Sequence, residues 1–143
     1  MKKIFYLFSF LLLSITACKK DSSTPETTSK NIAGVYKITA LTAKAGNSQQ
    51  VDVYNQLTSC QQNDTWGFQE DGTFLFGGAA NSVCQDGDFS GTWSLNNKSF
   101  SIRAQQNTTM YQLENFDGRA LVLSTSGTLN DNPATYFVTF TKQ

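Results

Sequence analysis

From Asn31 to Gln143 the chain alternates apolar and polar residues in short segments. Turn residues separate these segments about every eight to twelve positions, a spacing typical of antiparallel β-strands with one buried face. No window shows a convincing helical period of 3.6 residues, so we expect an all-β domain. The exception is the stretch from Val51 to Leu57, where we expect a turn of helix or a short edge strand.

Turn geometry tests this pattern, because a slip of one residue would turn the apolar face of one strand away from that of its neighbour. The three-residue loop Glu70-Asp71-Gly72, with glycine in the left-handed position, pairs Phe68 with Phe74 and Trp66 with Phe76. All four aromatic side chains then share one face.

Two further hairpins give the same result. The turn Asn97-Lys98 sets Leu95 opposite Phe100 and Trp93 opposite Ile102, and the loop Phe116-Asp117-Gly118 sets Leu113 opposite Leu121 and Tyr111 opposite Leu123. The apolar faces agree in each hairpin.

An opening strand and a closing strand complete the expected set. The first lies near residues 33–42 with Tyr36, Ile38 and Ala40 inward, and the last lies near residues 135–141 with Tyr136, Val138 and Phe140 inward. About eight consecutive antiparallel strands favour an up-and-down β-barrel, because closure removes exposed sheet edges. A two-sheet sandwich is the structural alternative.

The first seventeen residues are typical of an export signal. Lys2 and Lys3 precede an apolar run from Ile4 to Ile15, which fits the roughly 7 to 15 residues of a signal-peptide core and falls short of the roughly 20 that a membrane-spanning helix needs. We expect residues 1–17 to be removed.

The residues Ile15-Thr16-Ala17-Cys18 resemble the lipobox of bacterial lipoproteins, in which cleavage precedes a cysteine that carries lipid. This resemblance implies that Cys18 is acylated and tethers the protein to a lipid bilayer, since two or more acyl chains hold firmly. In the lipoproteins that this motif resembles, an aspartate directly after the cysteine favours retention at the inner membrane. Lys19 occupies that position here, so we expect the protein to be anchored in the cell envelope, at the outer membrane. Ordinary cleavage after Ala17, leaving a free thiol, is the alternative.

Residues 18–30 are expected to form a flexible linker, because the Ser/Thr-rich stretch from Lys19 to Lys30 has no apolar residue to bury. The folded domain is then 31–143, large enough for one core. Cleavage before Cys18 leaves 11 − 2 = 9 basic against 11 acidic residues. This mildly acidic chain without a basic face predicts no binding to nucleic acid, and we expect a monomer.

Cys60 and Cys84 are the remaining cysteines, and an even pair in an exported domain predicts a disulfide. Its loop of 84 − 60 + 1 = 25 residues corresponds to about 3 kcal/mol in the chain-entropy treatment. A metal site is the alternative. Two thiols without any histidine are short of the four ligands of a structural zinc, so we expect no metal and no cofactor.

Catalysis finds little support in the sequence, and we expect a protein that is not an enzyme. The chain has no histidine, which excludes Ser-His and Cys-His nucleophile systems. Local hydrogen bonding in turns explains most of the acidic residues; these are Asp64, Glu70, Asp71, Asp86, Asp88 and Asp117. The pair Asp86 and Asp88 lacks the pattern of a calcium loop.

Five sequence motifs, taken in their order along the chain, resemble those of a known family. They are Gly34-Val35-Tyr36, a cysteine at 60, FQEDGTFLF at 68–76, a cysteine at 84 and GTWSL at 91–95. Together they resemble the lipocalin-like domain of small lipoproteins in Bacteroidetes-type bacteria, over essentially all of residues 31–143. Tyr36 stands where the first strand of a lipocalin usually has Gly-x-Trp. The resemblance implies a barrel that binds a small ligand.

An eight-stranded barrel either fills with side chains or holds one small molecule. The inward aromatic residues form a core in the first case and line a pocket in the second. The predicted ligand-binding residues are Trp66, Phe68, Phe74, Phe76, Trp93, Tyr111 and Tyr136, with the run Gly77-Gly78-Ala79-Ala80 as a rim. We expect a small apolar or amphipathic ligand. The alternative is an envelope interaction module or inhibitor with a filled barrel, binding a protein or glycan through its loops.

Overall fold

The computed structural model describes residues 27–78, 84 and 87–143. The expected signal peptide, the expected acylation site Cys18 and most of the expected linker lie outside these residues, as do Ala79, Ala80 and Asp86. Within the described chain, no helix is long and apolar enough to span a bilayer.

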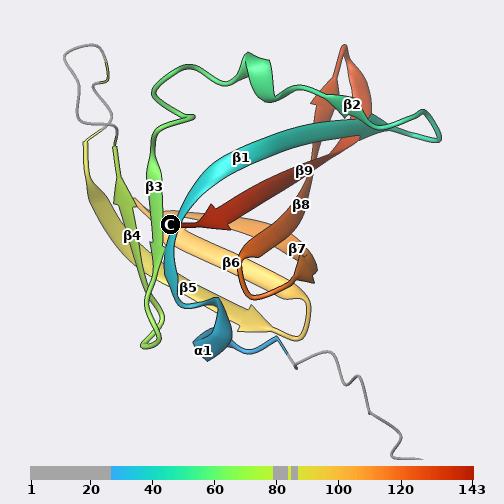
Figure 1. Ribbon diagram of the computed structural model, residues 1–143. Coiled ribbons are helices and arrows are strands. Elements are labelled where there is room, and N and C mark those ends of the chain that lie inside the picture. Colours follow the sequence, from blue (N-terminus) through green and yellow to red (C-terminus); the bar gives the residue numbers. More distant parts are fainter. Residues whose placement is uncertain (1–26, 79–83, 85–86) are drawn as a thin grey trace, which may run out of the picture.

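Antiparallel strands make up nearly all of the regular structure (Figure 1). The elements are α1 Ser29–Ile32, β1 Gly34–Ala45, β2 Val51–Asp52, the 3₁₀ turn η1 Tyr54–Gln56, β3 Thr65–Phe68, β4 Thr73–Gly77, β5 Phe89–Asn96, β6 Ser99–Ala104, β7 Asn107–Phe116, β8 Ala120–Leu129 and β9 Asn132–Lys142. The stretch from Val51 to Leu57 therefore contains both expected forms, an edge strand and a helical turn.

The sheet closes into a barrel. Each strand from β3 to β9 pairs with the next, and β1 pairs with β3 on one side and with β9 on the other. The eight strands β1 and β3–β9 therefore form a closed antiparallel barrel, and the short β2 adds to the end of β1. The prediction of an up-and-down barrel is confirmed, and the sandwich is excluded.

Two of the three predicted hairpin registers are confirmed residue by residue. Phe68 lies opposite Phe74 and Trp66 opposite Phe76, while Leu95 lies opposite Phe100 and Trp93 opposite Ile102. Gly72 has a φ of +86°, the left-handed conformation that its loop requires.

The register predicted for the β7–β8 hairpin is wrong by two residues. Leu113 lies opposite Leu123 instead of Leu121, and Phe116 belongs to β7, where it pairs with Leu121. A β-bulge at Glu114 adds one residue to β7. Because the error is an even number, the apolar faces still coincide, and Leu113, Leu121 and Leu123 are all buried.

A second β-bulge, in β1, changes which residues of that strand point into the barrel. The register with β9 shifts between Ile38, which pairs with Phe140, and Ala40, which pairs with Thr139. Residues beyond the shift change faces, so Ala40 points outward, contrary to the prediction. Ala43 takes an inward position instead and is fully buried.

Aromatic side chains fill the centre of the barrel. Phe68 is 1% exposed, and its ring centroid lies 5.3–5.7 Å from those of four neighbours. These neighbours are Tyr36, Phe74, Trp93 and Phe100. Such tilted and stacked aromatic pairs add stability beyond the apolar area that they bury.

The end of the barrel at which β1 begins, here called the α1 end, is closed. The turn α1 starts with Thr28 as its N-cap, so regular structure begins two residues before the expected domain boundary at Asn31. Ile32 is fully buried, and the Tyr36 hydroxyl donates to its carbonyl oxygen at 2.5 Å. Burial raises the pKa of Tyr36 to about 12, which keeps this hydroxyl protonated as a donor.

The predicted disulfide is present. Cys60 and Cys84 are bonded, with Cα atoms 5.5 Å apart. Cys60 belongs to the connection between β2 and β3, and Cys84 to the connection between β4 and β5. β3 begins and β4 ends at the end of the barrel opposite α1, so the bridge joins two connections that meet the sheet at that end.

Candidate functional site

A cavity of about 190 Å³ lies at the end of the barrel opposite α1, here called the open end. Its lining residues come from β3, β4, β5, β6 and β7 and from the β6–β7 turn: Trp66, Phe74, Phe89, Ile102, Ala104, Gln105, Asn107, Thr109 and Tyr111. Polar and apolar atoms share the surface of this lining about equally, and the polar side chains come from β7 and from the β6–β7 turn. Such a mixture is typical of small-molecule sites.

Strand register explains why β7 contributes polar side chains. Ala104 pairs with Asn107, and Ile102 pairs with Thr109. Opposite residues of an antiparallel pair point to the same face, and Ile102 is an inward core residue. Asn107 and Thr109 therefore share the inner face of the barrel.

Three of the seven predicted ligand-binding residues line this cavity: Trp66, Phe74 and Tyr111. The other four lie elsewhere. Phe68 and Trp93 are buried in the core below the cavity, and Phe76 packs against Phe89 with ring centroids 4.5 Å apart.

Tyr136 is the fourth predicted residue outside the cavity. It is in the inward register, opposite Thr125. However, β8 pairs with β7 only as far as Ser124, so Tyr136 lies beyond the closed part of the wall. Its hydroxyl donates to the carbonyl oxygen of Thr128 at 2.6 Å.

The two tryptophans differ in hydrogen bonding. The Trp93 ring nitrogen Nε1 donates to the carbonyl oxygen of Gln69 at 2.9 Å. The Trp66 Nε1 is buried and has no hydrogen-bond partner among the described residues. Trp66 therefore lines the cavity with part of its ring, while its N–H is covered by the protein.

Sequence reasoning missed the residues that the β6–β7 hairpin contributes to the cavity lining. The two residues of its turn, Gln105 and Gln106, have φ values of +49° and +68°. Neither residue is a usual left-handed turn former, so the turn gave no strong signal. The available signal was Ile102, already assigned inward. Counting across a two-residue turn from Ile102 would have placed Thr109 on the same face.

The lining residues that the structure describes carry no charge near pH 7. Among them Tyr111 alone is ionisable, and burial raises the pKa of its hydroxyl. Two acidic residues, Asp71 and Asp117, accept local hydrogen bonds in turns, as predicted. Hydrogen bonds from the backbone N–H of Thr73 lower the pKa of Asp71, and those from Ala120 and Arg119 lower the pKa of Asp117.

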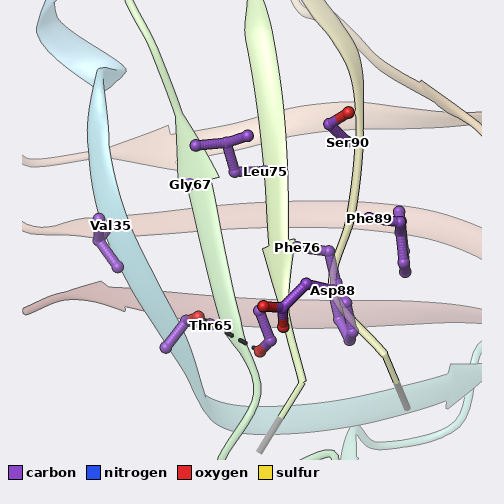
Figure 2. A pocket seen from close by; sticks show the side chains of 9 residues that line it. Val35, Thr65, Gly67, Leu75, Phe76, Asp88, Phe89 and Ser90 are labelled. Atoms are coloured by element: carbon purple, nitrogen blue, oxygen red, sulfur yellow. Dashed lines mark hydrogen bonds between the residues drawn. The ribbon is translucent and has the colours of Figure 1, made fainter.

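A second hollow lies on the outer face of β1, β3, β4 and β5 and has a volume of about 500 Å³ (Figure 2). Val35, Gly67, Leu75 and Ser90 form one row of paired residues across it. Gly67 has no side chain, so a trough separates Val35 from Leu75, which are 50% and 42% exposed. The predicted rim residues Gly77 and Gly78 lie at one end of β4, where Asp88 accepts a hydrogen bond from the Gly78 N–H.

Comparison with known proteins gives a family and similar solved structures. The model of a family described as "Lipocalin-like domain" matches residues 32–123. Among solved structures, the chain is similar to an uncharacterized protein from Bacteroides eggerthii DSM 20697, with 13% identity, a TM-score of 0.49, and coverage of 78% of this chain and 98% of that chain. The comparison with curated proteins gives no match.

Proposed function

Because the chain belongs to the lipocalin-like domain family, we propose that it is a lipid-anchored binding protein that holds a small apolar or amphipathic molecule in the open end of its barrel. The observation that carries this proposal is the cavity of about 190 Å³ between aromatic residues and the polar side chains of β7. Aromatic side chains together with convergent polar groups are usual components of a small-molecule site. The proposal assigns no enzymatic activity.

Filling the cavity tests this function. Thr108 and Thr109 are adjacent, exposed residues of β7 that point to opposite faces, since Thr109 pairs with inward Ile102 and Thr108 pairs with Arg103. A phenyl ring at position 109 will occupy the cavity. We expect Thr109→Phe to weaken binding about tenfold or more, while Thr108→Phe leaves it unchanged.

The measurement uses residues 27–143, which contain the closed barrel, its core and the disulfide. Native mass spectrometry will detect a copurified molecule, and tryptophan fluorescence will report binding from a panel that runs from single-ring compounds to fatty acids and hydrophobic dyes. If no panel member binds, or if the two variants weaken binding equally, the proposal fails.

The anchor is tested in the full chain. Replacing Cys18 by Ser removes the sulfur that the lipobox resemblance marks for acylation. We expect this variant to lose incorporation of labelled fatty acid and to leave the membrane fraction, since the lipid is proposed to supply the membrane affinity. Ser22→Ala, four residues away, should keep both properties. Label that persists in Cys18→Ser would refute the tether.

A second candidate function is an envelope interaction module that binds a protein or glycan from outside. The observation that favours it is the outer hollow, where Val35 and Leu75 expose apolar surface beside a filled barrel core (Figure 2). Failure of every small molecule to bind, combined with binding of an envelope protein or glycan that Leu75→Lys abolishes, would favour this module over the carrier.

A further inference from the structure

The outer hollow on β1, β3, β4 and β5 is complementary to itself in shape and in charge. We propose that two copies of this chain associate face to face through this hollow, about a two-fold axis that runs parallel to the strands. This association goes beyond the proposed binding function and does not depend on the cavity. It also departs from the monomer that the sequence led us to expect.

The shape comes from the row of paired residues Val35, Gly67, Leu75 and Ser90, which crosses the four strands (Figure 2). Along this row, large exposed side chains alternate with a small side chain or none. A two-fold rotation about an axis between β3 and β4 reverses the row. Leu75 of one copy then faces the trough above Gly67 of the other, and Val35 faces Ser90, so large meets small at every position.

The charges come from the neighbouring row of the same outer face. Thr65 pairs with Gly77, and one further step of the β1–β3 register places Lys37 beside Thr65. Lys37 lies between two inward core residues, so its side chain points outward. At the other end of the row, Asp88 is exposed, and its Oδ1 lies 4.0 Å from the position of a Cβ built on Gly77.

These two charges cannot form a close ion pair within one copy. Three strand spacings of roughly 4.8 Å separate β1 from β5, which puts Lys37 and Asp88 roughly 14 Å apart. The rotation that sets Leu75 above Gly67 also brings Lys37 of each copy opposite Asp88 of the other. Asp88 already accepts a hydrogen bond from the Gly78 N–H, and a carboxylate has acceptor sites for several more. Shape and charge therefore select the same arrangement.

The expected contact is small. Aligned sheets pack roughly 10 Å apart with their strand directions within about 30° of each other. Four strands, each contributing about four residues, cover a face of roughly 19 by 13 Å. This face is smaller than the roughly 800 Å² that each partner buries in a standard interface. We therefore expect weak association, with a dissociation constant of about 0.1 mM.

The symmetry is compatible with the proposed lipid anchor. Because the axis is parallel to the strands, β1 runs in the same direction in both copies, and the two α1 turns lie at the same end of the pair. Two anchors that precede α1 would then reach the same bilayer. Confinement to a surface raises the effective concentration, so a weak contact can still pair anchored copies.

Reversal of the two charges tests the arrangement. In Lys37→Asp the face carries two carboxylates, and in Asp88→Lys it carries two ammonium groups, so each variant should repel its own copies. When the two variants are mixed, an ammonium faces a carboxylate at both positions. Lys44→Asp is the matched control, because it changes the net charge as Lys37→Asp does. Lys44 is also an exposed residue of β1, but it pairs with Thr135 of β9, away from the outer hollow.

Sedimentation equilibrium of residues 27–143, at concentrations up to about 1 mM, measures the association. We expect the wild type and Lys44→Asp to dimerise equally, and Lys37→Asp and Asp88→Lys each to do so at least about tenfold more weakly. The equimolar mixture of these two variants should associate about as strongly as the wild type. Leu75→Ser should weaken the dimer about tenfold, because it removes the side chain that fills the trough.

The outcomes that contradict the proposal are distinct. A wild type that stays monomeric at about 1 mM overturns it. If an envelope protein or glycan then binds in a way that Leu75→Lys abolishes, the outer hollow belongs to the second candidate function. Charge variants that dimerise as well as the wild type would place the contact on another face, and a mixture that fails to associate would overturn the two-fold arrangement. Thr109→Phe tests the cavity separately, so failure of the carrier and failure of the dimer are distinguishable.

Discussion

Replacing Phe68 by Ala is expected to lower the free energy of unfolding by about 3–5 kcal/mol, because it empties the centre of the aromatic core. Phe68 is 1% exposed and contacts the rings of Tyr36, Phe74, Trp93 and Phe100. These rings come from four different strands held by the sheet, so they cannot collapse into the space. A loss of this size is a large share of the roughly 5–15 kcal/mol that stabilises a typical domain.

Chemical denaturation of residues 27–143 measures the effect, with Leu75→Ala as the matched control. Leu75 lies on β4 opposite Gly67, the residue that precedes Phe68 on β3. Its side chain points outward and is 42% exposed. We expect the control to cost no more than about 0.5–1 kcal/mol. If Phe68→Ala does not fold, Phe68→Leu should still cost about 1–2 kcal/mol. Equal losses in the Phe68 and Leu75 variants would contradict the inward orientation of Phe68.

Reduction of the Cys60–Cys84 bridge should lower the free energy of unfolding by about 3 kcal/mol, because the bridge closes a loop of roughly 25 residues in the unfolded chain. For a domain of this size the melting temperature should fall by roughly 10–20 °C. Differential scanning calorimetry with and without dithiothreitol measures the change.

The double variant Cys60→Ser, Cys84→Ser is the control for this experiment. It should melt at the temperature of the reduced wild type and should not respond to dithiothreitol, since the thiol reagent then has no bond to break. A wild-type melting temperature that is insensitive to dithiothreitol would show that the bridge does not stabilise the domain.

The hairpins that could be predicted from the sequence are those whose turns carry strong local signals. Gly72 supplies the left-handed position between β3 and β4, and Asn97 has a φ of +54° between β5 and β6. Each turn fixes the register by its length, and the register then places the aromatic residues on one face. Most of the fold follows from these local rules because consecutive strands from β3 to β9 pair with each other.

The sequence analysis missed the two β-bulges because the alternation of apolar and polar residues does not directly show that a strand contains one extra residue. Glu114 is the added residue of β7, and its carboxylate accepts a hydrogen bond from the Ser124 hydroxyl at 2.6 Å. A subtler sign was present at both bulges. Leu113 is followed by Phe116, and Ile38 by Leu41, so two apolar residues are three positions apart where regular alternation gives two.

The sequence predicted three of the nine residues that line the candidate site, and the rest were missed because their depth along the barrel axis was unknown. Alternation separates inward from outward residues, but it does not say how far along the axis each inward residue lies. Phe68 and Trp93 therefore belong to the filled core, whereas Trp66, on the same face as Phe68, reaches the cavity. Depth depends on stagger between strands and on where a wall ends, and both require the assembled structure.

The position of α1 fixes the end of the barrel at which a tether would join the domain. The described chain enters at the closed end, where Ile32 is buried and the Lys142 ammonium donates to the carbonyl oxygen of Ala33 at 2.6 Å. The proposed attachment at Cys18 precedes Thr27 by nine residues, a reach of roughly 30 Å when extended. The anchor and the cavity would then lie at opposite ends of the barrel, so the linker would leave the mouth of the cavity clear.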